Sequence, residues 1–176
     1  MRAVLTFISI ISLFTSLSCH DEKKQDPQDC CGNPAIEASF GNAHVYVPNI
    51  FTPNADGIND MLLVFGDSVS LISSFQISNE DGELVFYTQN INPNIELAGW
   101  NGEVNGEVIE GVYDILITVM AEDGTVKELE GKVCNYPCSV QPLPEISAPD
   151  QCQFPSQSWN GHFDPTLPSG ENFDCF

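Results

Sequence analysis

The residues with the clearest chemical potential in this 176-residue chain are its seven cysteines. Cys19 stands apart behind an apolar run, and the other six are Cys30, Cys31, Cys134, Cys138, Cys152 and Cys175. An even number of cysteines is typical of disulfide pairing in an exported protein. Adjacent cysteines do not readily bond to each other, so we expect the first pair to bond to the second pair, and the last two to close a loop. The alternative is a zinc site built from the first four thiolates.

A second set of candidate ligands lies in the loop Asn54–Asp60, with the sequence NADGIND. Its side-chain oxygens are of the kind that binds Ca²⁺, and they belong to Asn54, Asp56, Asn59 and Asp60. Aligning Gly57 with the glycine of an EF-hand puts Leu63 where a bidentate glutamate is required, so the loop is not an EF-hand. Two interpretations remain: a calcium turn of another kind, or a turn braced by its own Asn and Asp side chains. We favour the second, and expect no other cofactor.

The N-terminus predicts export. Residues 1–18 have the pattern of a signal peptide, because Arg2 precedes the apolar run Ala3–Leu17. At about 15 residues this run is shorter than the roughly 20 that span a bilayer as a helix, so a permanent transmembrane anchor is the weaker alternative. Residues 16–19 resemble the lipobox of bacterial lipoproteins, with Ser16 at the usual apolar position. The resemblance implies lipidation of Cys19 with acyl chains such as palmitate; the alternative is an ordinary signal peptide with a cysteine nearby.

Polar residues follow Cys19, so we expect residues 19–39 to form a flexible tether on the lipidated cysteine. The acidic stretch in this segment resembles the export signal that sends some lipoproteins of gliding bacteria to the outer face of the outer membrane. We therefore expect the outer membrane, reached through the lipid anchor, to be the chain's first partner. An envelope or secretion-machine protein is a second expected partner.

Strand-like patterns dominate from Phe40 onward. Asp-Gly turns separate alternating runs, which indicates hairpins. One face of Gly111–Met120, carrying Tyr113, Ile115, Ile117 and Val119, is expected to lie in the core. Six or seven short strands predict an all-β fold, a small antiparallel immunoglobulin-like β-sandwich over residues 40–138 with disulfide-rich flanks. The expected strands are His44–Val47, Met61–Phe65, Ser74–Ser78, Glu83–Thr88, Gly111–Met120 and Thr125–Cys134.

After this domain, residues 139–176 are predicted to be a proline-rich connector followed by a tail closed by its cysteines. Trp100 has two readings, a platform for carbohydrate or an aromatic plug between sheets, and we favour the plug.

The segment Val47–Asp60, VPNIFTPNADGIND, resembles the opening of the gliding-motility-associated C-terminal domain family. Further pieces follow in the family's order, at Gly99–Gly102 and Glu110–Tyr113, so that the resemblance covers about residues 45–134. It implies an immunoglobulin-like β-sandwich that serves as a type B sorting signal of the type IX secretion system, in a surface or secreted protein. The chain departs from the pattern in the turn Ser78–Glu83, which lacks the family's basic and aromatic residues, and in the 38 residues that follow Cys138.

Charge and motifs exclude several function classes. The chain has 25 Asp and Glu against 5 Lys and Arg, a net charge of -20, which argues against a nucleic-acid partner. We find no glycine-rich phosphate loop, nucleophile elbow or histidine pair at metal spacing, and no Cys–His motif, so we expect no enzymatic activity.

Two hypotheses remain. One is a lipoprotein that displays the sandwich at the cell surface as an accessory of gliding, adhesion or secretion; the other is a secreted protein whose sandwich is the sorting signal.

Overall fold

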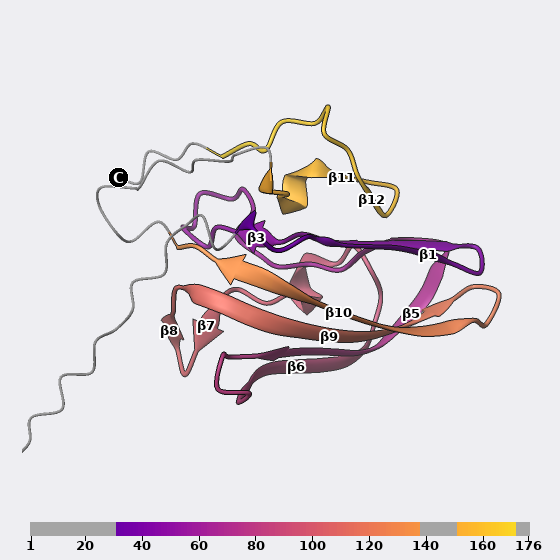
Figure 1. The fold of residues 1–176 in the computed structure, drawn as a ribbon, viewed down its shortest axis with the longest axis horizontal. Helices are drawn as coiled ribbons and strands as arrows, with labels where there is room; N and C mark the ends of the chain where they lie inside the picture. The colour runs from indigo at the N-terminus through magenta and orange to yellow at the C-terminus, as the bar shows by residue number, and fades with distance from the viewer. Residues whose placement is uncertain (1–30, 138–150, 172–176) are drawn as a thin grey trace, which may run out of the picture.

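The computed structural model describes residues 31–137 and 151–171, and these form an all-β fold of mostly antiparallel strands. A five-stranded sheet has the order β3-β10-β9-β5-β6, and a three-stranded sheet has the order β1-β2-β4 (Figure 1). The strands of the larger sheet are β3 (Ile50–Phe51), β10 (Val126–Asn135), β9 (Gly111–Ala121), β5 (Val69–Ser78) and β6 (Leu84–Ile91). Those of the smaller sheet are β1 (Ile36–Phe40), β2 (Ala43–Val47) and β4 (Phe65–Asp67).

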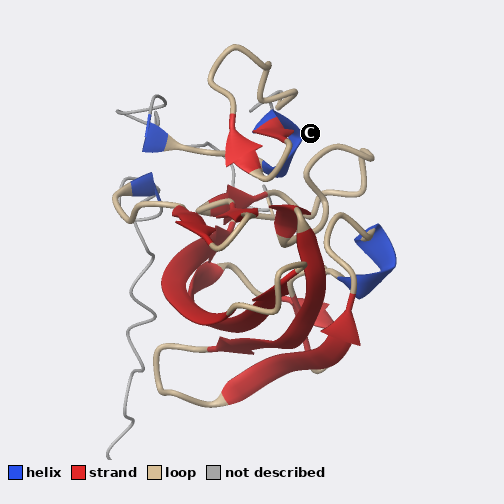
Figure 2. Ribbon diagram, turned by 90° about the vertical axis from the view of Figure 1, so that its right-hand side faces the viewer, coloured by secondary structure: helices blue, strands red, loops and turns tan. Residues whose placement is uncertain are grey.

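Short elements complete the fold. They are the 3-10 helices η1 (Glu96–Ala98) and η3 (Pro155–Gln157), the hairpin β7 (Glu103–Val104) with β8 (Glu107–Val108), and the hairpin β11 (Ser158–Trp159) with β12 (His162–Phe163). We call residues 36–137 the β domain and residues 151–171 the tail. The strands of the β domain curl around its core (Figure 2).

The core lies between the two sheets and draws apolar side chains from both of them. The predicted inner face of β9 is confirmed, because Tyr113, Ile115, Ile117 and Val119 are all buried. Trp100 is also buried, with its ring centroid 4.7 Å from that of Tyr113 and its indole N–H donating to the Glu103 carbonyl at 3.1 Å. The aromatic plug was therefore the right interpretation of Trp100.

The two predicted hairpins are confirmed. β5 pairs with β6 around the turn at Asn79–Gly82, and β10 pairs back along the whole of β9. Gly82 takes a φ of 78°, a conformation that is accessible to glycine without a steric cost.

Two expectations about strand positions were wrong. The run Met61–Phe65 is not a strand: Leu62 makes an isolated bridge to Trp100, and β4 begins only at Phe65. Leu62, Leu63 and Val64 are all buried, and a continuous apolar run shows burial without showing backbone geometry. In addition, β1 begins at Ile36, inside the segment predicted to be a flexible tether, and pairs with β2.

The predicted disulfide partners of Cys31 and Cys152 were wrong. Cys31 bonds to Cys152 across 121 residues of sequence, with a Cα–Cα distance of 4.8 Å. Cys31 therefore does not pair with Cys134 or Cys138, and Cys152 does not close a loop with Cys175. Cys134 is disulfide-bonded as well, so the zinc-site alternative loses two of its four thiolates. The predictions for Cys19, Cys30, Cys138 and Cys175 concern positions outside the described residues.

The tail forms a third layer over the three-stranded sheet (Figure 1). Its hairpin packs on β2, where the His162 ring lies 4.2 Å from the His44 ring and the Phe163 ring lies 6.0 Å from the Tyr46 ring. A His162 ring nitrogen lies 3.3 Å from the Glu37 carboxylate on β1. The tail therefore returns to the N-terminal side of the β domain, which explains why Cys152 meets Cys31.

Candidate functional site

The tail meets the β domain along a row of buried polar side chains in the segment Val47–Asp60. This segment contains β3, which pairs in parallel with the end of β10 and buries Ile50 and Phe51. Asn49 precedes these two residues and Thr52 follows them, while Asn59 closes the loop by accepting the Thr52 N–H at its carbonyl, at 2.9 Å. Of the four buried polar residues in the described part of the chain, three are Asn49, Thr52 and Asn59. We call these three the acceptor row because they receive the tail, through side-chain hydrogen bonds that they both donate and accept.

Asn49 binds the start of the tail through its side-chain amide. Its Nδ2 donates to the carbonyl of Gln151 at 2.9 Å and to that of Asn33 at 2.8 Å, while its Oδ1 accepts the N–H of Gln153 at 2.8 Å. A buried amide needs partners for both its donor and its acceptor, and Asn49 finds all three in the backbone of segments on either side of it. The side chain therefore joins the tail to the segment leading into β1.

Asn59 binds two later parts of the tail in the same way. Its Oδ1 accepts the N–H of Ser156 at 2.8 Å, and its Nδ2 donates to the carbonyl of Ser169 at 2.8 Å and to Glu171 Oε1 at 2.7 Å. The Asn59 amide thus holds Ser156, near the start of this part of the tail, and residues 169–171, at its end, against the loop that contains Asn59.

Glu171 is the one tail carboxylate in this interface. Its Oε1 accepts from the hydroxyl of Thr52 as well as from Asn59. Burial raises the pKa of Glu171, the hydrogen bonds from Thr52 and Asn59 act against that shift, and the nearby charges of Asp56 and Asp60 add to it. The two hydrogen bonds therefore only partly offset the cost of burying the charged Glu171 carboxylate beside two other acids.

The four loop residues proposed as calcium ligands all make hydrogen bonds within the loop or to the tail. Asp60 Oδ1 accepts the N–H groups of Asn54 and Ala55 at 3.0 and 2.7 Å, and its Oδ2 accepts that of Gly57 at 2.8 Å. Asp56 accepts the Ile58 N–H at 2.8 Å, and Asn59 faces the tail. These are the bonds of a turn braced by its own side chains, with Gly57 at a φ of 87°. Among residues 31–137 and 151–171 there is no group of three or more His, Cys, Asp or Glu that could hold a metal ion.

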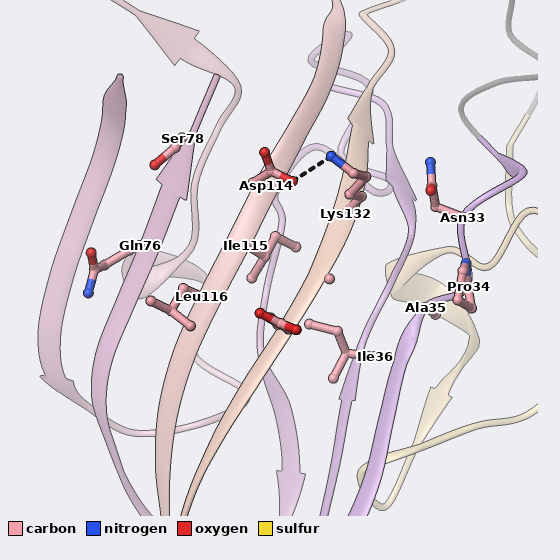
Figure 3. Close-up of a pocket in the computed structure, with 12 residues that line it drawn as sticks. Asn33, Pro34, Ala35, Ile36, Gln76, Ser78, Asp114, Ile115, Leu116 and Lys132 are labelled. Atoms are coloured by element: carbon pink, nitrogen blue, oxygen red, sulfur yellow. Dashed lines mark hydrogen bonds and ion pairs between the residues drawn. The ribbon is translucent and has the colours of Figure 1, made fainter. Parts of the chain in front are cut away.

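A shallow cavity of about 560 Å³ lies elsewhere, between the segment leading into β1 and the strands β5, β9 and β10 (Figure 3). Its most polar feature is the ion pair between Lys132 and Asp114, at 2.5 Å on neighbouring strands, with both side chains about half exposed. The residues that line it include a serine, Ser78, but neither a cysteine nor a histidine. The cavity therefore does not combine a nucleophile with a histidine base.

The family model of the CHU_C type IX secretion signal domain matches residues 45–133 of the chain, about half of its length. The chain belongs to this family. The match confirms the resemblance seen in VPNIFTPNADGIND, and it includes the whole acceptor row while ending before the tail. The CHU_C domain is a non-catalytic sorting-signal family, and it indicates a secreted or cell-surface protein with a role related to type IX secretion.

No curated protein matches the chain. Within the described ranges 31–137 and 151–171, no helix is long and apolar enough to cross a membrane.

Sequence reasoning found one of the three acceptor residues and gave it another role. Asn59 was a candidate calcium ligand, whereas Asn49 and Thr52 were not singled out. The available signal was their position, because a polar residue stands on each side of the buried pair Ile50–Phe51. The partners in the tail lie about 100 residues away and left no local mark in the sequence.

The tail hairpin gives a direct test of its docking. Gly161 has a φ of 72°, and a Cβ there would lie 2.6 Å from the His44 carbonyl oxygen and 2.7 Å from the Asp67 nitrogen. We expect Gly161→Ala to push the hairpin off β2 and β4, raising the amide hydrogen exchange rates of the tail at least about tenfold, the equivalent of 1.4 kcal/mol.

Gly124→Ala is the matched control for this variant. Gly124 also has a positive φ, 87°, but a Cβ there would meet nothing within 4 Å. Both variants carry the backbone cost of a left-handed alanine, and only Gly161→Ala adds the clash. Equal exchange rates in the tails of the two variants would show that the hairpin is not seated on the sheet as described.

Proposed function

We propose that this chain is a non-enzymatic cell-envelope lipoprotein that displays the CHU_C domain as an interaction module at the outer membrane surface. The module would be an accessory of gliding, adhesion or type IX secretion. One observation carries the proposal: the residues after the family domain fold back on it, and Cys152 bonds to Cys31 on its N-terminal side. A sorting signal is read as an accessible end of a secreted chain, whereas here the segment that follows the domain is fastened to it.

Two further features support display over catalysis. The cavity at β5, β9 and β10 is lined by Ser78 and the Lys132–Asp114 ion pair, but by no cysteine or histidine. The described residues contain Lys127 and Lys132 as their only Lys or Arg side chains, so the displayed surface is strongly acidic and suits a partner with a basic face.

The experiment that tests this proposal compares the wild type with Cys19→Ser. We expect the purified wild-type protein to begin at Cys19, to carry added acyl mass and to partition with the outer membrane. The variant should lose both the mass and the membrane association, because acyl chains supply the anchor at about 0.8 kcal/mol per buried methylene. Intact mass spectrometry and membrane fractionation give the two readouts. An unacylated wild-type protein in the medium would overturn the proposal.

The family match favours a second candidate function, that of a secreted protein whose CHU_C domain is its type IX sorting signal. This alternative predicts a free mature protein, and export that fails when the type IX secretion machinery is removed. A lipidated protein that still reaches the outer membrane without that machinery would reject it.

A further inference from the structure

We propose that the acceptor row is a peptide-binding site of the CHU_C domain, and that the tail is its tethered ligand. The site would accept an extended segment of the same chemistry from a partner protein when the tail is displaced. This inference rests on the proposed function as an interaction module, and it adds where the partner binds and what kind of partner it is.

The tail is a layer separate from the main core. Every residue of the main apolar cluster, including its partly buried members, lies between Ile36 and Val133. The tail contributes only Cys152 and Phe154, and these belong to a second, smaller cluster with Cys31, Ile50, Val112, Cys134 and Tyr136. The two-sheet core is therefore closed without the tail, as the core of an independent receptor for it must be.

The acceptor row contacts mainly the backbone of the tail. Asn49 and Asn59 each accept one tail N–H and donate to at least one tail carbonyl, the pattern by which one strand pairs with another. Backbone recognition does not depend on the identity of most ligand side chains. A different extended peptide can make the same bonds.

Two tail side chains add specificity. Phe154 is buried in the smaller cluster, its carbonyl accepts the Tyr46 hydroxyl at 3.1 Å, and Pro155 follows it at the first position of η3. The second is Glu171, which accepts from Thr52 and Asn59. The partner segment is therefore an extended peptide with an aromatic residue before a proline, and a carboxylate further along the chain.

The smaller cluster also holds a polar group that the tail does not use. The Tyr136 hydroxyl is buried and has no hydrogen-bond partner among the described residues. A buried hydroxyl without a partner costs stability, so a ligand carrying one more polar group at this point has a bond available that the tail leaves unmade.

The test uses the full chain with Cys31→Ser and Cys152→Ser and a protease site inserted within residues 138–150. The probe is a fluorescent peptide with the sequence of residues 151–171 and serine at position 152. After cleavage and removal of the cut tail, we expect the probe to bind with one-to-one saturation, measured by fluorescence anisotropy. Before cleavage, the tethered tail competes at a millimolar effective concentration, so the apparent affinity should be at least about 100-fold weaker.

A double-mutant cycle then locates the binding site. Thr52→Val keeps the shape of the side chain and removes the donor to Glu171, so it should weaken probe binding about tenfold. A probe with Glu171→Ala should bind the parent protein more weakly and should show no further loss with Thr52→Val. Thr88→Val on β6 is the matched control and should leave the affinity unchanged.

Four results would overturn the proposal. The first is a loss of Trp100 burial when the cut tail is washed away. It would appear as a red shift of Trp100 fluorescence in a Trp159→Phe background, and it would show that the tail is an integral part of the fold. A cut tail that never exchanges with the probe would show the same. Equal binding of a scrambled probe, or no effect of Thr52→Val, would show that the acceptor row does not select its ligand. None of these readouts depends on lipidation of Cys19, so they fail or succeed separately from the proposed function.

Discussion

Replacing Trp100 by alanine is expected to lower the free energy of unfolding of the β domain by about 3–5 kcal/mol. The ring is 1% exposed and packs in tilted and edge-on contacts with Phe51 and Tyr113, at centroid distances of 5.5 and 4.7 Å. The truncation removes apolar area, leaves a cavity and strands the Glu103 carbonyl that accepts the indole N–H. Urea unfolding followed by circular dichroism measures the loss.

Trp159→Ala is the matched control, because it removes the chain's other tryptophan. Trp159 lies on β11 and is 63% exposed, so its loss should change the free energy of unfolding by no more than about 0.5 kcal/mol. If Trp100→Ala were as mild as Trp159→Ala, the two sheets would not be packed around Trp100 as described.

Local pattern predicted most of the β domain. The alternation of β9 placed its buried face correctly, and the turn at Asn79–Gly82 predicted the β5–β6 hairpin. These elements are specified by neighbours in sequence, through a period of two and through glycine at a positive φ. The run Met61–Phe65 failed because both of its sides are covered, so its composition reported burial and not conformation.

The candidate site could not be predicted in the same way, because it is made by contacts across about 100 residues. Asn49 and Asn59 have short polar side chains common in turns, and their sequence context favoured local roles. Their partners are mostly backbone groups of the tail, and a backbone carbonyl carries no signature in the sequence. The pairing of Cys31 with Cys152 has the same origin, since six cysteines allow 15 pairings and only docking of the tail selects this one.

Removing the Cys31–Cys152 disulfide with Cys31→Ser and Cys152→Ser is expected to lower the free energy of unfolding by about 2–5 kcal/mol. The bond closes a stretch of 121 residues that includes the whole β domain, and a cross-link over so long a loop restricts the unfolded chain strongly. In the folded state it also fixes the tail beside Asn49. We therefore expect two measurable effects relative to the wild type. The urea midpoint should fall, and hydrogen exchange should speed up more in the tail than in β9.

The pairing itself can be checked with the single variant Cys31→Ser, in which Cys152 has lost its partner. Alkylation under native and denaturing conditions, followed by peptide mapping, should find a modified Cys152 in the variant and an unmodified Cys152 in the wild type. Cys152 that stays unmodified in the variant would mean that it bonds to another cysteine, as the initial pairing with Cys175 requires. In that case the tail would close on itself, and its hold on the β domain would depend on the hydrogen bonds of the acceptor row alone.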